Sequence, residues 1–182
     1  ITAQRQFNQQ IEVVKGKSIN KYVILKKYYF DFKKSNITGR TKDKNKLSKI
    51  EKVLLRKTGS DLIATYDDSG VFPEQSLYFL YDFKINSKFI LALLNSQLFN
   101  WYYQNRLVTN EDSTPQLKSF DLESFPIKTN QAIILFQSIA DYILFLRNKL
   151  FRDESYQLIP NYFEQIIDGM VYELYFPELL KK

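Results

Sequence analysis

Acidic residues that lie close to a lysine are the part of this sequence best suited to chemistry. Asp67 or Asp68 comes first, and Asp82 and Lys84 follow further along the chain. This order fits the loose pattern of metal-dependent nucleases, in which two carboxylates hold a divalent ion and a lysine helps to activate water. A chain with 20 acidic and 26 basic residues produces such a match easily by chance. A polar turn beside a solvated strand end explains the same residues, so a nuclease domain stays an alternative.

The residue types that are missing exclude most other reactions. The sequence has no histidine and no cysteine, which removes serine triads, thiolate nucleophiles, disulfides and His- or Cys-ligated metals. Its five glycines lie too far apart to form the Gly-x-Gly turn that cradles a phosphate. Any catalysis in this chain would therefore have to use Asp, Glu, Lys or Tyr. Because the sequence starts at Ile1 rather than at a methionine, we expect it to be a piece of a longer protein.

Positive charge is concentrated in the first third of the chain. Residues 1–57 contain 16 basic and four acidic residues, a formal charge of +12. Residues 58–182 contain 10 basic and 16 acidic residues, a formal charge of −6. Such an asymmetry within one chain indicates a polyanionic partner for the basic part. A solvated lysine-rich surface has the same composition and remains the alternative interpretation.

The first half of the chain predicts short strands. Residues 20–32 alternate aromatic or β-branched residues with polar ones, which indicates a strand or the edge of a hairpin. Residues 33–49 lack apolar periodicity and predict a mobile basic loop. Three further strands, separated by turn sequences, are predicted at residues 52–57, 62–66 and 76–81.

The second half predicts helices. Apolar residues at three- and four-residue spacing, ending at Trp101, predict a helix over about 87–104 that is capped by Asn86 or Ser87. The following residues predict a loop and then, over 117–127, a short irregular segment. Two apolar stripes at helical spacing cover residues 132–150 and 163–174. Asn161 and Glu164 resemble a capping box before the second stripe.

These elements together predict an α+β fold. We expect a small, mostly antiparallel sheet with a central helix, followed by a C-terminal helical hairpin. Residues 1–128 would form the α+β domain, and residues 129–182 would form the hairpin packed on it. No apolar run approaches the ~20 residues that a membrane helix needs, and no signal peptide opens the chain. We therefore expect no contact with a membrane.

Five stretches of the sequence, taken in order, resemble one known family. They are VVKGKSINKY (13–22), KVLLRKTGSDLIATYDDSG (52–70), LNSQLFNWYY (94–103), TPQLKSFDLESFPI (114–127) and FEQIIDGMVYELYF (163–176). The first four are similar to parts of the TaqI-like C-terminal specificity domain, and the last is similar to the helical tail that follows it. This domain is the target-recognition part of N6-adenine DNA methyltransferases and of fused restriction-modification enzymes of type IIG.

The resemblance implies a division of labour within a longer bacterial, cytoplasmic enzyme. In the family, a separate N-terminal domain binds S-adenosylmethionine and flips out the adenine, which an Asn-Pro-Pro-Tyr motif grips. This sequence lacks that motif, because its nearest string, Ile159-Pro160-Asn161-Tyr162, has the wrong order. We therefore expect methylation and cofactor binding upstream of Ile1. The chain itself would be non-catalytic and would bind no cofactor or metal.

The resemblance and the charge together indicate sequence-specific recognition of double-stranded DNA. Phosphate contacts are expected from basic residues of the first third, namely Lys15, Lys17, Lys21, Arg40, Lys42, Lys44 and Lys46. Arg56 and Lys57 lie beside a turn from which a guanidinium can reach a guanine edge, although a further phosphate contact or a salt bridge to Asp61 is also possible. Tyr66, at a strand end and beside a turn, is a candidate exposed aromatic residue for contact with DNA. Besides the nuclease, the other alternative is a protein-interaction module with a solvated basic loop.

Overall fold

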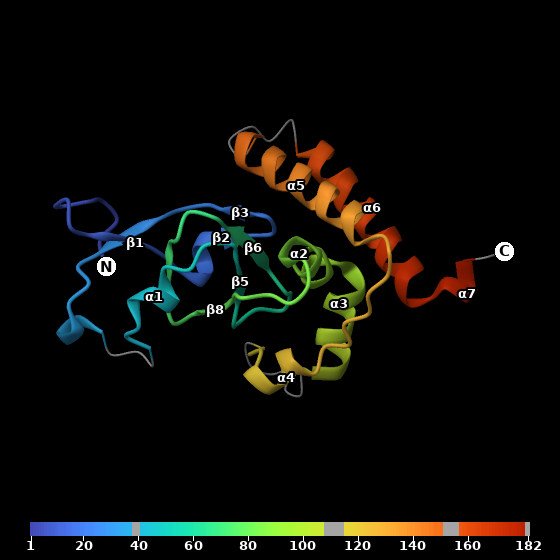
Figure 1. Ribbon diagram of the computed structural model, residues 1–182, viewed down its shortest axis with the longest axis horizontal. Coiled ribbons are helices and arrows are strands. Elements are labelled where there is room, and N and C mark those ends of the chain that lie inside the picture. Colours follow the sequence, from blue (N-terminus) through green and yellow to red (C-terminus); the bar gives the residue numbers. More distant parts are fainter. Residues whose placement is uncertain (38–40, 108–114, 151–156, 181–182) are drawn as a thin grey trace.

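The computed structural model describes residues 1–37, 41–107, 115–150 and 157–180, and its fold is α+β as predicted (Figure 1). The strands lie toward the N-terminal end of the molecule, and two long helices lie toward its C-terminal end. The helix α2 lies between these two parts. Among the described residues, no helix has the length and apolar character needed to cross a membrane.

A three-stranded antiparallel sheet occupies the centre of the molecule. Its middle strand is buried on both faces, with Leu54 on one side and Val53 and Leu55 on the other. The strand order is β6-β5-β8, and Leu54 lies opposite Thr65 and Phe79. The three strands predicted here are confirmed as β5 (Lys52–Arg56), β6 (Ala64–Asp67) and β8 (Leu77–Leu80).

The N-terminal part of the chain forms a second sheet and a small hairpin, and residues 20–32, predicted as a strand or the edge of a hairpin, are not one continuous strand. The chain turns at Tyr22, which has a positive φ of 62° and a buried side chain. The alternating pattern could not reveal this turn, because tyrosine rarely adopts that conformation. The segment instead contributes to three short strands. Two of them, β2 and β3, pair only with each other in an antiparallel hairpin, and the third, β4, joins a second sheet in which β1 pairs antiparallel with β4 and parallel with β7. The strands are β1 (Ile11–Val14), β2 (Ile19–Asn20), β3 (Val23–Ile24), β4 (Tyr28–Phe30) and β7 (Phe72–Pro73).

The segment predicted as a basic loop contains a short helix. Asp43 caps this helix by accepting hydrogen bonds from the backbone N–H groups of Asn45 and Lys46. Leu47 fixes the helix to the second sheet, where it is buried with Val13 and Phe72. A single apolar residue produces no periodic pattern, so the sequence did not predict this helix. The helix is α1 (Lys44–Leu47), and 3₁₀ turns precede it at Gly16–Ser18 and Lys34–Asn36.

The central helix begins at the predicted cap but is interrupted at Ser96. Asn86 accepts hydrogen bonds from the N–H groups of Lys88 and Phe89, which confirms it as the N-cap. The hydroxyl of Ser96 donates to the carbonyl of Leu93 and accepts from the next helix, so one residue ends one helix and starts another. Trp101, expected on the apolar stripe, is 55% exposed. The pieces are α2 (Ser87–Asn95), α3 (Gln97–Tyr102) and a π-helical turn, η3 (Tyr103–Leu107).

A short helix also occupies part of the segment that was predicted to be irregular. The carboxylate of Asp121 accepts a hydrogen bond from the N–H of Lys118 and so stabilises the first turn. The helix ends before Pro126, which cannot continue it. This helix is α4 (Ser119–Glu123).

The predicted pair of C-terminal helices is present, but the predicted capping box is wrong. The side chains of Asn161 and Glu164 both accept hydrogen bonds from Arg147 instead of capping a helix end. The second helix therefore starts earlier, with Pro160 in its first turn, where a missing N–H costs nothing. The helices are α5 (Ile133–Leu150), α6 (Leu158–Tyr175) and a short α7 (Pro177–Leu180).

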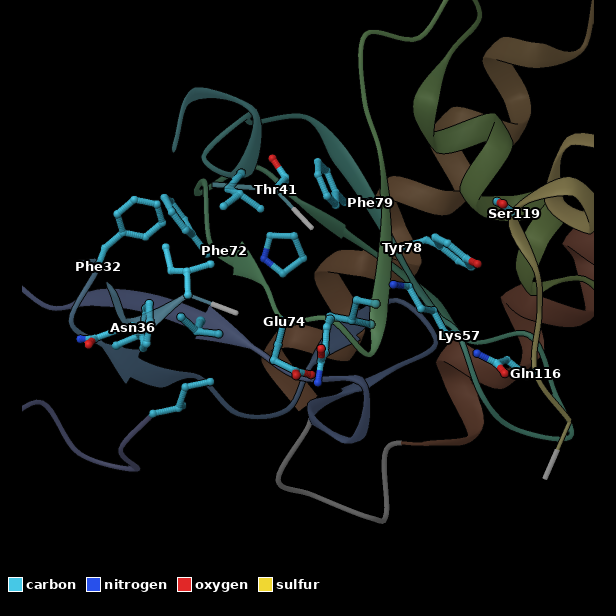
Figure 2. A pocket seen from close by; sticks show the side chains of 18 residues that line it. Phe32, Asn36, Thr41, Lys57, Phe72, Glu74, Tyr78, Phe79, Gln116 and Ser119 are labelled. Carbon is cyan, nitrogen blue, oxygen red and sulfur yellow. The ribbon is translucent and has the colours of Figure 1, made fainter. Parts of the chain in front are cut away.

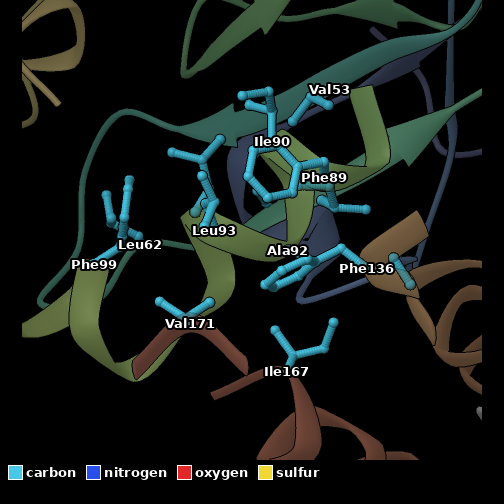
Figure 3. Packing of buried hydrophobic residues seen from close by; sticks show 14 of the residues in the cluster. Val53, Leu62, Phe89, Ile90, Ala92, Leu93, Phe99, Phe136, Ile167 and Val171 are labelled. Carbon is cyan, nitrogen blue, oxygen red and sulfur yellow. The ribbon is translucent and has the colours of Figure 1, made fainter. Parts of the chain in front are cut away.

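The main hydrophobic core joins the central sheet to the helical hairpin through α2 (Figure 3). Phe89 of α2 packs edge-on against Phe136 of α5, with ring centroids 5.1 Å apart. Ile167 and Val171 of α6 lie in the same cluster, as does Val53 of the sheet. The hairpin is therefore packed on the α+β part through one continuous core.

An ion pair is fully buried between the two strands β5 and β6. The ammonium of Lys52 lies 2.6 Å from the carboxylate of Asp67, and the side chains are 0% and 1% exposed. Lys52 also donates to the carbonyl of Lys49, and Asp67 accepts hydrogen bonds from the N–H and hydroxyl of Ser69. Burial lowers the pKa of Lys52, and the nearby carboxylate partly offsets this effect. The pair fixes the turn that follows β6.

Replacement of Lys52 by methionine should destabilise the fold strongly. The Lys52→Met variant leaves a buried carboxylate without its cation, and we expect the free energy of unfolding to fall by about 3–5 kcal/mol. The double variant Lys52→Met/Asp67→Asn should lose less. Urea denaturation followed by circular dichroism measures both. Lys49→Met, which removes an exposed ion pair with Asp82, is the matched control and should cost less than about 1 kcal/mol.

Candidate nucleic-acid interface

A groove of about 870 Å³ lies between the second sheet, α1 and β8 (Figure 2). One part of its wall is aromatic and contains Phe32, Phe72 and Phe79. Another part is polar and contains Lys57 and Gln116. The groove thus combines apolar surface with groups that can donate and accept hydrogen bonds.

Ser76 joins basic segments that lie far apart in the sequence. Its hydroxyl accepts a hydrogen bond from the N–H of Gly16 at 2.8 Å, and its carbonyl accepts one from the N–H of Lys57 at 3.1 Å. The turn that carries Lys15 and Lys17 is therefore held next to Lys57. A Cβ atom at Gly16 would lie 3.2 Å from the hydroxyl oxygen of Ser76, so glycine permits this close approach.

The lysines near Ser76 differ in their contacts with aromatic rings. The ammonium of Lys15 lies 4.6 Å from the centre of the Tyr28 ring, and Lys26 approaches the same ring at 5.2 Å. The ammonium of Lys57 lies 4.7 Å from the centre of the Tyr78 ring, beside the groove. Lys17 is exposed. Stacking on aromatic faces restrains the first three side chains while leaving their charge available to a partner.

Arg56 forms bonds within the protein. Its Nε donates to the carbonyl of Gly16 at 2.8 Å, and its terminal nitrogen donates to the carbonyl of Ile19. Burial lowers the pKa of Arg56. The guanidinium therefore ties the end of β5 to the turn between β1 and β2, and this geometry favours a structural role.

The lysines of α1 and the residues before it occupy another side of the groove. Lys42, Lys44 and Lys46 are exposed, while Thr41 and Leu47 line the groove itself. Because Leu47 is buried in the second sheet, α1 presents its lysines from a fixed position. Arg40, which was predicted to contact phosphate, lies outside the described residues.

Two predicted contact residues lie away from the groove. The ammonium of Lys21 donates to the carbonyl of Asn95 at 2.8 Å, at the end of α2, where a cation also complements the helix dipole. Tyr66, which was expected to be exposed, is half-buried against the main core, with the ammonium of Lys88 5.1 Å from its ring centre. Burial raises the pKa of Tyr66. Neither residue lines the groove.

The acidic residues of the first third are mostly engaged within the protein. Glu12 pairs with Lys27 at 2.7 Å, Asp31 pairs with Lys33 at 2.8 Å, and Asp43 caps α1. Within the described part of the chain, no ion pair is found for the exposed lysines Lys17, Lys44 and Lys46. The positive charge of this region is therefore directed toward solvent.

The carboxylates of the nuclease-like pattern are paired with different lysines. Asp67 belongs to the buried pair with Lys52, and Asp82 pairs with Lys49 at 2.9 Å. Asp68 is exposed. Over residues 1–37, 41–107, 115–150 and 157–180, no group of three or more acidic residues is placed to hold a metal ion.

The sequence patterns did not identify Gln116 or Asn36, two polar residues that line the groove. Gln116 follows a proline in a stretch without periodicity, and Asn36 lies in a segment predicted to be a loop. Neither position carries a local signal, because the fold alone brings these side chains to the groove.

Comparison with known proteins gives one family and a structural relative. The sequence model described as the TaqI-like C-terminal specificity domain matches residues 11–127. No curated protein matches the chain. Among solved structures, the type IIL restriction-modification enzyme MmeI in complex with DNA is similar with a TM-score of 0.63 and 11% sequence identity. The similarity covers 92% of this chain and 28% of that chain, so it extends beyond the family match.

Substitution of Arg56 should reduce stability. In Arg56→Lys, one ammonium cannot reach both carbonyls in the geometry of a guanidinium, and we expect the free energy of unfolding to fall by about 1–3 kcal/mol. Chemical denaturation provides the measurement. Lys17→Met, an exposed substitution in the turn that Arg56 holds, should change stability by less than about 0.5 kcal/mol. An unchanged stability of Arg56→Lys would contradict the structural role.

Proposed function

The chain belongs to the family of TaqI-like C-terminal specificity domains, and on this basis we propose that it recognises a target sequence in double-stranded DNA. It does so as one part of a restriction-modification enzyme. The observation that carries this proposal is the set of exposed lysines beside the groove, Lys17, Lys44 and Lys46, which form no ion pair within the described residues, while three nearby acids bind other groups of the protein. The fold similarity to MmeI, a restriction-modification enzyme solved with DNA, supports it.

The arrangement of cations fits a phosphate backbone. Lysine ammonium groups neutralise phosphates and release counterions, which supplies affinity and orients the duplex without reading its sequence. We assign this role to Lys15, Lys17, Lys42, Lys44 and Lys46. Arg40 keeps the same assignment on its position in the sequence alone. The cations come from two separate elements beside the groove, so a duplex would be held at more than one place.

The remaining predicted contacts divide into two groups. Lys57 lies beside the groove, where it can contact a phosphate or the edge of a guanine. Arg56, Lys21 and Tyr66 make contacts inside the protein, and we propose that they position the interface rather than touch DNA.

We further propose that the chemistry lies in another part of a longer chain. This chain spans 28% of the length of MmeI, which leaves room for further domains in a protein of that kind. An upstream domain would bind S-adenosylmethionine and methylate adenine at N6, in the cytoplasm of a bacterium. The present chain would select the site at which that domain acts.

Reversing two lysine charges on α1 should weaken DNA binding equally for all sequences. Binding should fall with salt at a log–log slope of about −0.9 for each phosphate contacted, so Lys44→Glu/Lys46→Glu should reduce the slope by roughly 2. Fluorescence anisotropy with a labelled duplex over a salt series measures this. Both side chains are exposed, so the free energy of unfolding should stay unchanged.

The matched control reverses two exposed lysines on the helical side of the molecule. Lys128→Glu/Lys149→Glu has the same net charge as the α1 variant but changes residues away from the groove. It should retain the wild-type slope. Equal loss of binding in both variants would show that net charge alone attracts DNA, and no binding by the wild type at low salt would refute the proposed function.

A further inference from the structure

We propose that Gln116 is a specificity-determining residue that reads the major-groove edge of an adenine. This inference rests on the proposed function and names the chemistry by which part of the target is read. It starts from a short ladder that the sequence did not predict. Thr58 and Gln116 lie directly opposite each other in an antiparallel bridge.

The backbone of this ladder is held on both sides. The N–H of Leu117 donates to the carbonyl of Lys57 at 2.8 Å, and the N–H of Gly59 donates to the carbonyl of Pro115 at 3.0 Å. Lys57 is also bonded through its own N–H to Ser76, so the ladder extends the edge formed by β5 and β8. A side chain on such a backbone has a fixed starting point, which base reading requires.

Two tyrosines fix the ladder to the body of the protein. The hydroxyl of Tyr78 donates to the carbonyl of Leu117 at 3.1 Å, and that of Tyr103 donates to the carbonyl of Gly59 at 3.1 Å. Leu117 is 1% exposed and belongs to the main core. Because side chains alternate along an extended segment, the burial of Leu117 directs Gln116 to the opposite, exposed face.

The side chain of Gln116 has the functional groups that an adenine edge requires. Its carboxamide can accept from the adenine N6 amino group and donate to N7, a pairing that discriminates adenine from the other bases. Within the described residues no hydrogen bond of this carboxamide is found. Other polar residues of the groove are engaged, since Glu74 accepts from Ser76 and Asn36 donates to the carbonyl of Asp31.

The surroundings of Gln116 favour contact with DNA. Lys57 lies beside the same groove, and Figure 2 shows both side chains on the same part of its wall. Lys118, two residues further along, is exposed as well, with its ammonium 5.5 Å from the Phe120 ring centre. Cations on both sides bring phosphates close, and a neutral amide between them can then approach a base edge.

Selection from a randomised duplex pool tests the inference. The wild-type chain should enrich one motif that contains a required adenine. Gln116→Ala should relax the preference at that one position by roughly 5- to 150-fold, because a bidentate contact is lost. Gln116→Glu should change the preference there toward cytosine, because the N4 amino group of cytosine can donate a hydrogen bond to a carboxylate. For Gln116→Ala, the base preferences at the other positions of the motif should match those of the wild type. The salt dependence of its binding to a non-specific duplex should also be unchanged.

The matched control is Gln165→Glu, the same substitution at an exposed glutamine of α6, and it should enrich the wild-type motif. If both Gln116 variants enrich the wild-type motif with unchanged preferences, the inference is overturned while the proposed function stands. If the wild type enriches no motif, the proposed function fails and the inference fails with it. Thermal denaturation of each variant verifies that it is folded.

Discussion

The geometry of the candidate interface depends on one guanidinium, that of Arg56. The side chain extends from the end of the buried strand β5 and binds the carbonyls of Gly16 and Ile19. Because β5 is fixed by the sheet on both sides, the turn held by Arg56 cannot move independently of it. Lys15 and Lys17 therefore lie beside Lys57 in a fixed arrangement. The sequence predicted that Arg56 contacts DNA. Its hydrogen bonds indicate instead that Arg56 holds other residues in position to make such contacts.

The helical half of the molecule supports the same sheet from its other face. The side chain of Asn95 exchanges two hydrogen bonds with the backbone of Ala64, at 2.9 and 3.0 Å, and Asn100 accepts one from Leu62 at 2.7 Å. These two amides lie on either side of Ser96, which ends α2 and starts α3. Buried amides with satisfied hydrogen bonds fix the position of a helix more closely than apolar packing alone. The hairpin then covers α2 and completes the core.

The sequence predicted the elements whose pattern is local and missed those that depend on distant partners. The strands around Val53 and the cap at Asn86 follow from alternation and from cap chemistry, and both are confirmed. The turn at Tyr22 was missed, because a positive φ in tyrosine leaves no sequence signal. Asn161 was assigned to a helix cap but binds Arg147, since the partner of a polar side chain is selected by the tertiary fold. The groove was missed for the same reason, although the basic character of its surroundings was clear from charge alone.

Lysine footprinting tests most directly whether DNA lies against the groove and the lysines beside it. The chain is treated with an amine-reactive reagent with and without a duplex, and the modification of each lysine is measured by mass spectrometry. We expect DNA to protect Lys17, Lys44 and Lys46, while Lys128 and Lys149 react as before. Protection of Lys128 and Lys149 with no change at Lys17, Lys44 and Lys46 would contradict DNA binding at the groove.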